Sequence, residues 1–181
     1  MKPLRSIARV ALVSAGVTVA SLAHGLPSVG ANRPATKITD AWSRTLDLAK
    51  LSGRPVLLLY EDKDSAPQNQ PLKDELAKLA KGDKYKATIA LVAVADVSAY
   101  DYWPARGFVK DAIKKESRKH ATTIYCDWDG RFRESLALDA NTSNVVLYGK
   151  DGSVLLSHAG AMPPEKRARL VELLRAEVGE R

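Results

Sequence analysis

The sequence predicts an α/β protein built on a mixed sheet. Two short apolar runs, residues 55–60 and 88–95, have the composition of strands buried on both faces, and a helical pattern follows each of them. Nearer the C-terminus, two further apolar runs are joined by a turn that contains Asp151-Gly152, which is a strong signal for a β-hairpin. Parallel strands followed by a hairpin indicate one sheet that contains both parallel and antiparallel pairs.

The first 25 residues have the pattern of a secretory signal peptide. Lys2, Arg5 and Arg9 precede an apolar run over residues 10–23, after which small residues stand at the spacing that a signal peptidase recognises. The apolar run is shorter than the roughly 20 residues that a membrane span needs. We therefore expect a periplasmic or secreted protein with no stable membrane span after cleavage; an uncleaved N-terminal anchor helix is the alternative.

Composition limits what the remaining chain can do. Residues 26–38 are rich in Pro, Gly and small residues and are expected to form a flexible linker, which leaves residues 39–179 as one domain. Removing residues 1–25 takes away three basic and no acidic residues, so the formal charge falls from +7 to +4. This mildly basic charge is spread along the chain and does not indicate nucleic-acid binding.

The first half of the domain combines two helical patterns with the two buried strands. Asp40 can cap a helix that starts near Ala41, in which apolar residues recur at 42, 46 and 49 before Ser52-Gly53 ends it. After the strand at 55–60, leucines at 72, 76 and 79 predict a helix over residues 68–80, with Gly82 just past its end. The strand at 88–95 follows.

The second half contains an additional helix and strand before the hairpin. A helix is expected over residues 106–120, with Phe108 and Ile113 on its apolar face and four lysines on the other. The other expected elements are a strand at 122–126, a short helix at 131–138, hairpin strands at 144–148 and 153–157, and a last helix that opens at 163–165. Since parallel crossovers are right-handed, the parallel strands should end at one edge of the sheet, where ligands of such sheets bind.

Residues 54–175 resemble the thioredoxin-like superfamily. The resemblance rests on three motifs: the strand residues 54–59, the Cys126-Asp127-Trp128-Asp129-Gly130 turn, and the hairpin residues 145–152. It implies a thioredoxin-like three-layer α/β/α sandwich with a mixed central sheet and an extra α-β insertion at about 104–126. More narrowly, residues 143–147, 150–152 and 160–161 are similar to the YtfJ-type exported proteins, a family without an established activity.

The resemblance also implies that dithiol chemistry is lost. The two redox cysteines of thioredoxins align with Ser65 and Gln68, and Cys126 is the single cysteine of the chain. An internal disulfide needs two thiols. The cis-proline of the family aligns with Ser143, which we expect to follow a trans bond because a non-proline cis bond costs roughly 2.5–4 kcal/mol.

Two functions stay open. The first is a redox-inactive module of the periplasm that binds a protein or peptide partner through the groove equivalents Ser65, Gln68 and Ser143 and through Tyr100 and Trp103, since exposed aromatic residues make good anchors. The second is a single-cysteine thiol redox protein, either peroxiredoxin-like or a thiol–disulfide oxidoreductase, that uses Cys126 as its nucleophile. The neighbouring Asp127 and Asp129 would raise the pKa of this thiol, which favours a structural role.

Metal and cofactor sites are not indicated. His120, His158, Cys126 and Asp127 fit no zinc-binding spacing, and we expect neither a metal nor a cofactor. His120 at a helix C-terminus has the place of a capping residue. The acidic loop 61–64 could bind a cation, although a solvated loop is the simpler interpretation.

Overall fold

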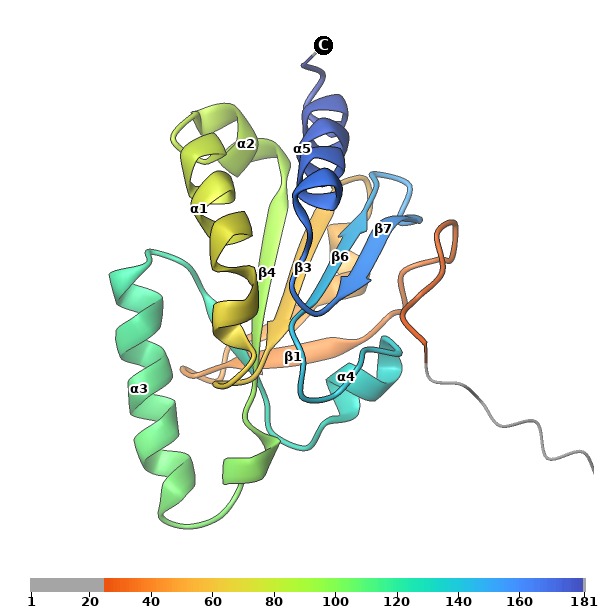
Figure 1. Cartoon of the computed structure of the whole chain (residues 1–181). Coiled ribbons are helices and arrows are strands. Elements are labelled where there is room, and N and C mark those ends of the chain that lie inside the picture. The colour runs from red at the N-terminus through yellow and green to blue at the C-terminus, as the bar shows by residue number, and fades with distance from the viewer. Residues whose placement is uncertain (1–24, 181) are drawn as a thin grey trace, which may run out of the picture.

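A seven-stranded mixed sheet forms the centre of the protein, as Figure 1 shows for the computed structural model. The structure describes residues 25–180, so the signal peptide expected at 1–25 lies almost wholly outside the described residues. The strand order across the sheet is β2-β1-β5-β4-β3-β6-β7, in which β3, β4 and β5 are parallel and the other neighbours are antiparallel. The strands are β1 (Lys37–Asp40), β2 (Thr45–Asp47), β3 (Val56–Glu61), β4 (Ala90–Asp96), β5 (Ile124–Asp127), β6 (Asn144–Tyr148) and β7 (Val154–Ala159).

Helices connect and cover these strands. The α-helices are α1 (Gln70–Leu79), α2 (Asp83–Thr88), α3 (Ala105–Lys119), α4 (Arg131–Ser135) and α5 (Pro164–Glu177), and the short 3-10 helices are η1 (Leu48–Leu51), η2 (Ala66–Asn69) and η3 (Ser98–Tyr100). The predicted extra helix and strand are present as α3 and β5, and β5 extends the parallel part of the sheet beyond β4. The α/β fold with a mixed sheet is therefore confirmed.

Apolar clusters on both faces of the sheet produce the three layers. Successive strand residues point to opposite faces. On one face, Leu57 and Leu59 of β3 pack in a cluster with Leu72 of α1 and with residues of α5. On the other face, Leu58 belongs to a cluster that contains Phe132 of α4. Strand β3 is thus buried from both sides, which explains its continuous apolar run.

The prediction of a helix after Asp40 is wrong, because the chain forms the β1–β2 hairpin there instead. Asp40 Oδ1 accepts hydrogen bonds from the backbone N–H groups of Trp42 and Arg44, both at 2.9 Å. Ser43 has a φ of 67°, in the left-handed region that closes a tight turn. β1 then pairs with β5. Strand pairing with a distant part of the chain therefore overrides the helical spacing of the apolar residues.

The N-terminal segment of the described chain lies beside the β6–β7 hairpin. The Gly30 N–H donates to the carbonyl of Val154 at 2.8 Å, and the Arg33 N–H donates to the carbonyl of Gly152 at 2.8 Å. Two apolar side chains of the segment also pack against the core. Strand β1 begins at Lys37, inside the range expected to be a linker. The structure thus gives this range specific backbone contacts.

Smaller differences concern the helices. The helix expected over 68–80 is divided into η2 and α1, and α2 and η3 were not expected. Phe108, expected on the buried face of its helix, is exposed. Within residues 25–180, no helix combines the length and apolar composition needed to cross a membrane.

Candidate functional site

The carboxyl ends of β3, β4 and β5 meet at one edge of the sheet. The register places Glu61 beside Ala95 and Asp96 beside Asp127. Polar residues at this edge form two groups. One surrounds the turn that follows β3, and the other joins β3, β4, β5 and α4.

The turn after β3 uses Ser65 for structure. The Ser65 backbone N–H donates to Asp62 Oδ1 at 2.7 Å, and the Asp62 backbone N–H donates to Ser65 Oγ at 3.0 Å. The Gln68 N–H donates to the Ser65 carbonyl at 3.0 Å, which starts η2. Ser65 is buried. Its hydroxyl therefore stabilises the turn and is not presented to solvent.

Gln68 connects this turn to the start of β6. Its Oε1 accepts the backbone N–H of Ser143 at 3.0 Å and the hydroxyl of Thr142 at 3.1 Å. Ser143 is fully buried, and its hydroxyl donates to Glu61 Oε1 at 2.7 Å. Among the described residues the cis peptide bond precedes Pro104, so the bond before Ser143 is trans. The Ser143 N–H and hydroxyl are both satisfied internally.

Asn69 extends the same network to the segment after β7. Its Nδ2 donates to Ser143 Oγ at 2.8 Å and to the Gly160 carbonyl at 2.9 Å, and its Oδ1 accepts the Met162 N–H at 2.8 Å. We call the connected residues Glu61, Gln68, Asn69, Thr142 and Ser143 the Gln68 network. The sequence analysis did not single out its members Asn69 and Thr142 for this site, nor Lys73, which contacts Glu61 at its edge.

Lys73 of α1 neutralises the acidic member of the Gln68 network. Its Nζ lies 2.7 Å from Glu61 Oε2 and donates to the Ala66 carbonyl at 2.6 Å. One oxygen of the Glu61 carboxylate therefore accepts a hydrogen bond from the Ser143 hydroxyl, and the other forms an ion pair with the Lys73 ammonium group. A cation is not needed to balance its charge. This arrangement gives no support to cation binding by the acidic loop.

The structure brings Ser65, Gln68 and Ser143 together but leaves the aromatic candidates in a separate segment. Tyr100 is half-buried and packs against the apolar cluster that contains Cys126. Trp103, in the connection between η3 and α3, is exposed. No hydrogen bond found among the described residues joins either of them to Gln68, whose side chain bonds to Thr142 and Ser143.

Cys126 lies inside the protein at the end of β5. It is buried with Ala41 and Val97, and α3 covers it through Val109 and Ile113. Burial, and after it the charge of Asp40, raises the pKa of the Cys126 thiol to about 11. The direction agrees with the sequence analysis, but the responsible carboxylate is Asp40 rather than Asp127 or Asp129.

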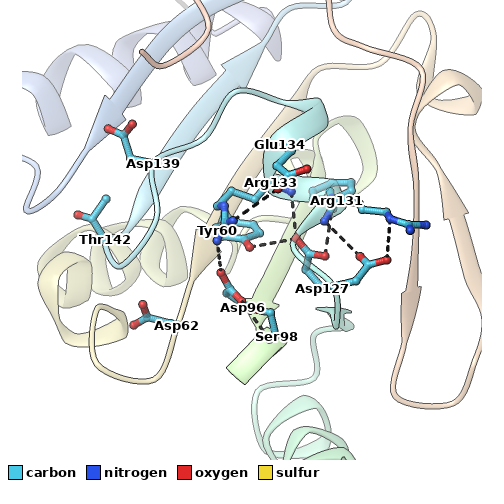
Figure 2. Close-up of polar contacts among 12 residues, drawn as sticks. Tyr60, Asp62, Asp96, Ser98, Asp127, Arg131, Arg133, Glu134, Asp139 and Thr142 are labelled. Atoms are coloured by element: carbon cyan, nitrogen blue, oxygen red, sulfur yellow. Dashed lines mark hydrogen bonds and ion pairs between the residues drawn. The ribbon is translucent and has the colours of Figure 1, made fainter. Parts of the chain in front are cut away.

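A second polar group surrounds Asp127 (Figure 2). The Tyr60 hydroxyl donates to Asp127 Oδ2 at 3.0 Å, and the backbone N–H of Arg133 donates to the same oxygen at 3.0 Å. The Arg133 guanidinium lies 3.2 Å from Asp96 Oδ2, and Ser98 Oγ donates to Asp96 Oδ1 at 2.6 Å. The group ties the ends of three parallel strands to the start of α4.

The two carboxyl groups of this second polar group, Asp96 and Asp127, have pKa values that are shifted in opposite directions. Burial raises the pKa of Asp127, and the hydrogen bonds from Arg133 and Tyr60 only partly oppose it. Burial also raises the pKa of Asp96, but the bonds from the Ser98 hydroxyl and backbone N–H together with the charge of Arg133 outweigh it, so the net shift is downward. Burial and these carboxylates raise the pKa of Tyr60. The sequence signal for this group was a polar residue at the end of each parallel strand.

The histidines do not assemble a site. His120 ends α3 and lies 3.3 Å from Glu116, as expected for a residue at a helix end. His158 contacts the Ala161 carbonyl and Lys166 at 3.2 Å each. Within the part of the chain that the structure describes, no group of three or more His, Cys, Asp or Glu residues is arranged to hold a metal ion.

Comparison with solved structures identifies the fold as thioredoxin-like. Similar structures include a candidate thiol:disulfide interchange protein DsbE from Chlorobium tepidum (20% identity, TM-score 0.62, covering 84% of this chain and 99% of that chain). The exposed lipoprotein thioredoxin Etrx1 from Streptococcus pneumoniae is also similar (18% identity, TM-score 0.57, covering 79% of this chain and 99% of that chain). A candidate protein disulfide isomerase from Bacteroides thetaiotaomicron gives a TM-score of 0.64 at 18% identity, covering 85% of this chain and 92% of that chain. No protein-family model and no curated protein sequence matches the chain.

Proposed function

We propose that this protein is an exported thioredoxin-fold module that binds a protein or peptide partner without dithiol chemistry. The observation that carries the proposal is that the turn after β3 contributes Ser65 and Gln68, not cysteines, to a closed set of hydrogen bonds. The pattern of residues 1–25 supports export. The names of the similar DsbE and exposed lipoprotein Etrx1 are consistent with it.

Burial of the single cysteine argues against the alternative function. A thiolate, not a thiol, is the nucleophile in peroxidase and disulfide-exchange reactions. With a pKa of about 11, the Cys126 thiol stays protonated at neutral pH. It is also buried, so a peroxide or a disulfide has no direct approach to its sulfur.

The surface proposed for the partner lies over the Gln68 network. Pro67 and Gln68 are exposed, and Thr142 is partly exposed. The hydrogen bonds of Gln68 Oε1 hold these residues in one arrangement before any partner arrives. A surface that is already ordered loses little conformational freedom on binding, which favours affinity. Since the Ser143 N–H is already paired, recognition there would use side chains rather than strand pairing.

Site-specific photo-crosslinking in exporting cells tests the proposal. A photoreactive residue at Pro67 should yield a discrete adduct with another polypeptide, and the same residue at Lys150 should not. Lys150 is the matched control because it is exposed and lies in the hairpin turn at the opposite end of β3 from Pro67. Equal adducts at both positions would contradict the proposed surface.

A turnover measurement tests the absence of dithiol chemistry. The purified protein should not reduce insulin disulfides in the presence of dithiothreitol faster than dithiothreitol alone. A clear acceleration that disappears in the Cys126→Ser variant would overturn the proposed function and restore the single-cysteine alternative.

A further inference from the structure

Three large aromatic side chains project into solvent around the start of α3. Trp103 is 91% exposed, Phe108 74% and Tyr102 60%. We call Tyr102, Trp103 and Phe108 the aromatic tip. Exposed apolar residues scattered singly are common, whereas a large exposed apolar patch marks an interaction site with a protein or a membrane; these three lie within residues 102–108.

The backbone of the aromatic tip is held in a fixed conformation. The Tyr102 N–H donates to the Tyr100 carbonyl at 2.9 Å, and the Arg106 N–H donates to the Tyr102 carbonyl at 2.9 Å. The Arg106 guanidinium pairs with Asp101 and lies over the ring of Trp128, 4.5 Å from its centroid. The exposure of the aromatic rings is therefore built into the fold.

The tip lies at an extremity of the molecule. In Figure 1 the connection from η3 to α3 forms the lowest part of the described chain, and α3 rises from it along one side of the sheet. Two surface hollows lie away from the tip, one beside the N-terminal segment and the other on α5. The segment that carries the tip is thus a projection from the body of the domain.

Helix α3 adds positive charge beside the tip. Its 15 residues include six Lys or Arg and two Asp or Glu, a formal net charge of +4. Lys115 and Lys119 follow Phe108 by seven and eleven residues, which places them on the same outward face of the helix. The two acids are paired within the helix, Asp111 with Lys114 at 3.0 Å and Glu116 with Lys119 at 3.3 Å.

We propose that the aromatic tip and the outward face of α3 bind the surface of an anionic phospholipid bilayer. Trp and Tyr rings prefer the level of the headgroups, and each Lys or Arg near an anionic leaflet adds attraction to its phosphates. Protein interfaces are enriched in aromatic residues too but are depleted in Lys, so the lysines of α3 beside the tip favour a lipid surface. The surface is separate from the Gln68 network, so the module could hold a partner while it lies on a membrane.

Vesicle binding tests the inference with the protein in its exported form. Sedimentation should show association with vesicles of equal parts phosphatidylglycerol and phosphatidylcholine, and little association with phosphatidylcholine alone. The double variant Trp103→Ala/Phe108→Ala should bind at least about tenfold more weakly, since both rings lose their place in the interface. Lys115→Glu/Lys119→Glu should also lower binding about tenfold or more.

Matched controls distinguish vesicle binding through the α3 face from an effect of the net charge of the protein. Lys50→Glu/Lys81→Glu makes the same change in net charge at exposed sites outside α3, and should leave binding within about twofold of the parent. Every variant keeps the same N-terminal residues, so any contribution from them cancels. Trp103→Phe should keep binding but lose the blue shift in tryptophan emission that the parent shows with vesicles.

The results that would overturn the inference are specific. Equal binding to both kinds of vesicle, or equal loss in the Lys50/Lys81 control, would show that the α3 face is not responsible. A vesicle-independent protein adduct from a photoreactive residue at Trp103, with no vesicle binding, would assign the tip to a protein partner instead. In the Trp103→Ala/Phe108→Ala variant, loss of vesicle binding with an unchanged adduct from Pro67 is the result that supports the inference, because the two surfaces then act separately.

Discussion

Cys126 shows at the scale of one residue how burial sets chemistry. Because its pKa is raised to about 11, we expect iodoacetamide to react with the folded protein far more slowly at neutral pH than with a free thiol. In urea the reaction should become fast, since the unfolded thiol regains an ordinary pKa. Mass spectrometry of the alkylated fraction against time measures both rates. Rapid labelling of folded protein would contradict the buried position.

Asp40 is expected to be among the most important single carboxylates for stability. It is buried, accepts two backbone hydrogen bonds and pairs with Arg44 Nε at 2.6 Å. Asp40→Ala should lower the free energy of unfolding by about 1–3 kcal/mol, measured by urea denaturation. Asp64→Ala, at an exposed carboxylate, is the matched control and should change it by less than about 0.5 kcal/mol.

The pKa of Asp40 fixes the sign of its pH dependence. Burial raises it, but the bonds from Arg44 and Trp42 and the charge of Arg44 lower it more, so its pKa is below the ordinary value when folded. Its contribution is then present above the unfolded pKa and is lost as pH falls through the folded pKa. The stability difference between the parent and Asp40→Ala should therefore shrink in acid. A difference that grows in acid would contradict this assignment.

The contribution of Asp127 to stability should depend on pH in the opposite sense to that of Asp40. Its pKa is raised in the folded protein, chiefly by burial, so its favourable contribution is present below the unfolded pKa and is lost as pH rises through the folded pKa. Asp127→Asn has no charge to bury. Urea denaturation over a pH series should show the variant gaining stability relative to the parent as pH rises from acid to neutral. A constant difference would indicate that Asp127 has the same pKa folded and unfolded.

At the scale of elements, Asn69 joins the start of α1 to β6 and to the segment before α5. Asn69→Ala would leave the Met162 N–H and the Gly160 carbonyl without their side-chain partner. We expect a loss of about 1–3 kcal/mol in urea denaturation. Gln70→Ala, at an exposed neighbour that bonds only to exposed Asp74 among the described contacts, is the control and should have little effect. Equal effects of the two variants would exclude a special role for Asn69.

Elements with a strong local pattern could be predicted from the sequence. The buried runs of β3 and β4 and the Asp-Gly hairpin were found because each pattern is contained in a few neighbouring residues. The β1–β2 hairpin was missed because its apolar residues recur at helical spacing and because β1 also pairs with β5, far along the chain. Similarly, Ser65, Gln68 and Ser143 were associated through the family resemblance. Asn69 was missed because its partners lie more than 70 residues away, so it has the appearance of an ordinary polar residue at a helix start.

At the scale of the whole molecule, the segment before β1 completes the domain. Removing residues 26–33 would delete the backbone hydrogen bonds of Gly30 and Arg33 to the hairpin and expose part of the core. We expect a loss of about 2–4 kcal/mol, which for a chain of this size lowers Tm by roughly 5–15 °C. Differential scanning calorimetry measures the shift. An unchanged Tm would show that the segment is the linker that its composition predicts.

The sheet order also determines when the domain can finish folding. The segment at 26–36 pairs with the hairpin near Val154, and β1 pairs with β5. The part of the domain that is synthesised first therefore cannot form these contacts until the later segments have been synthesised. Contacts between distant parts of a chain form slowly. If the protein is exported as proposed, its leading residues have no partners while the rest of the chain is still crossing the membrane. The topology thereby delays completion of the domain until the β6–β7 hairpin has reached the same side of the membrane.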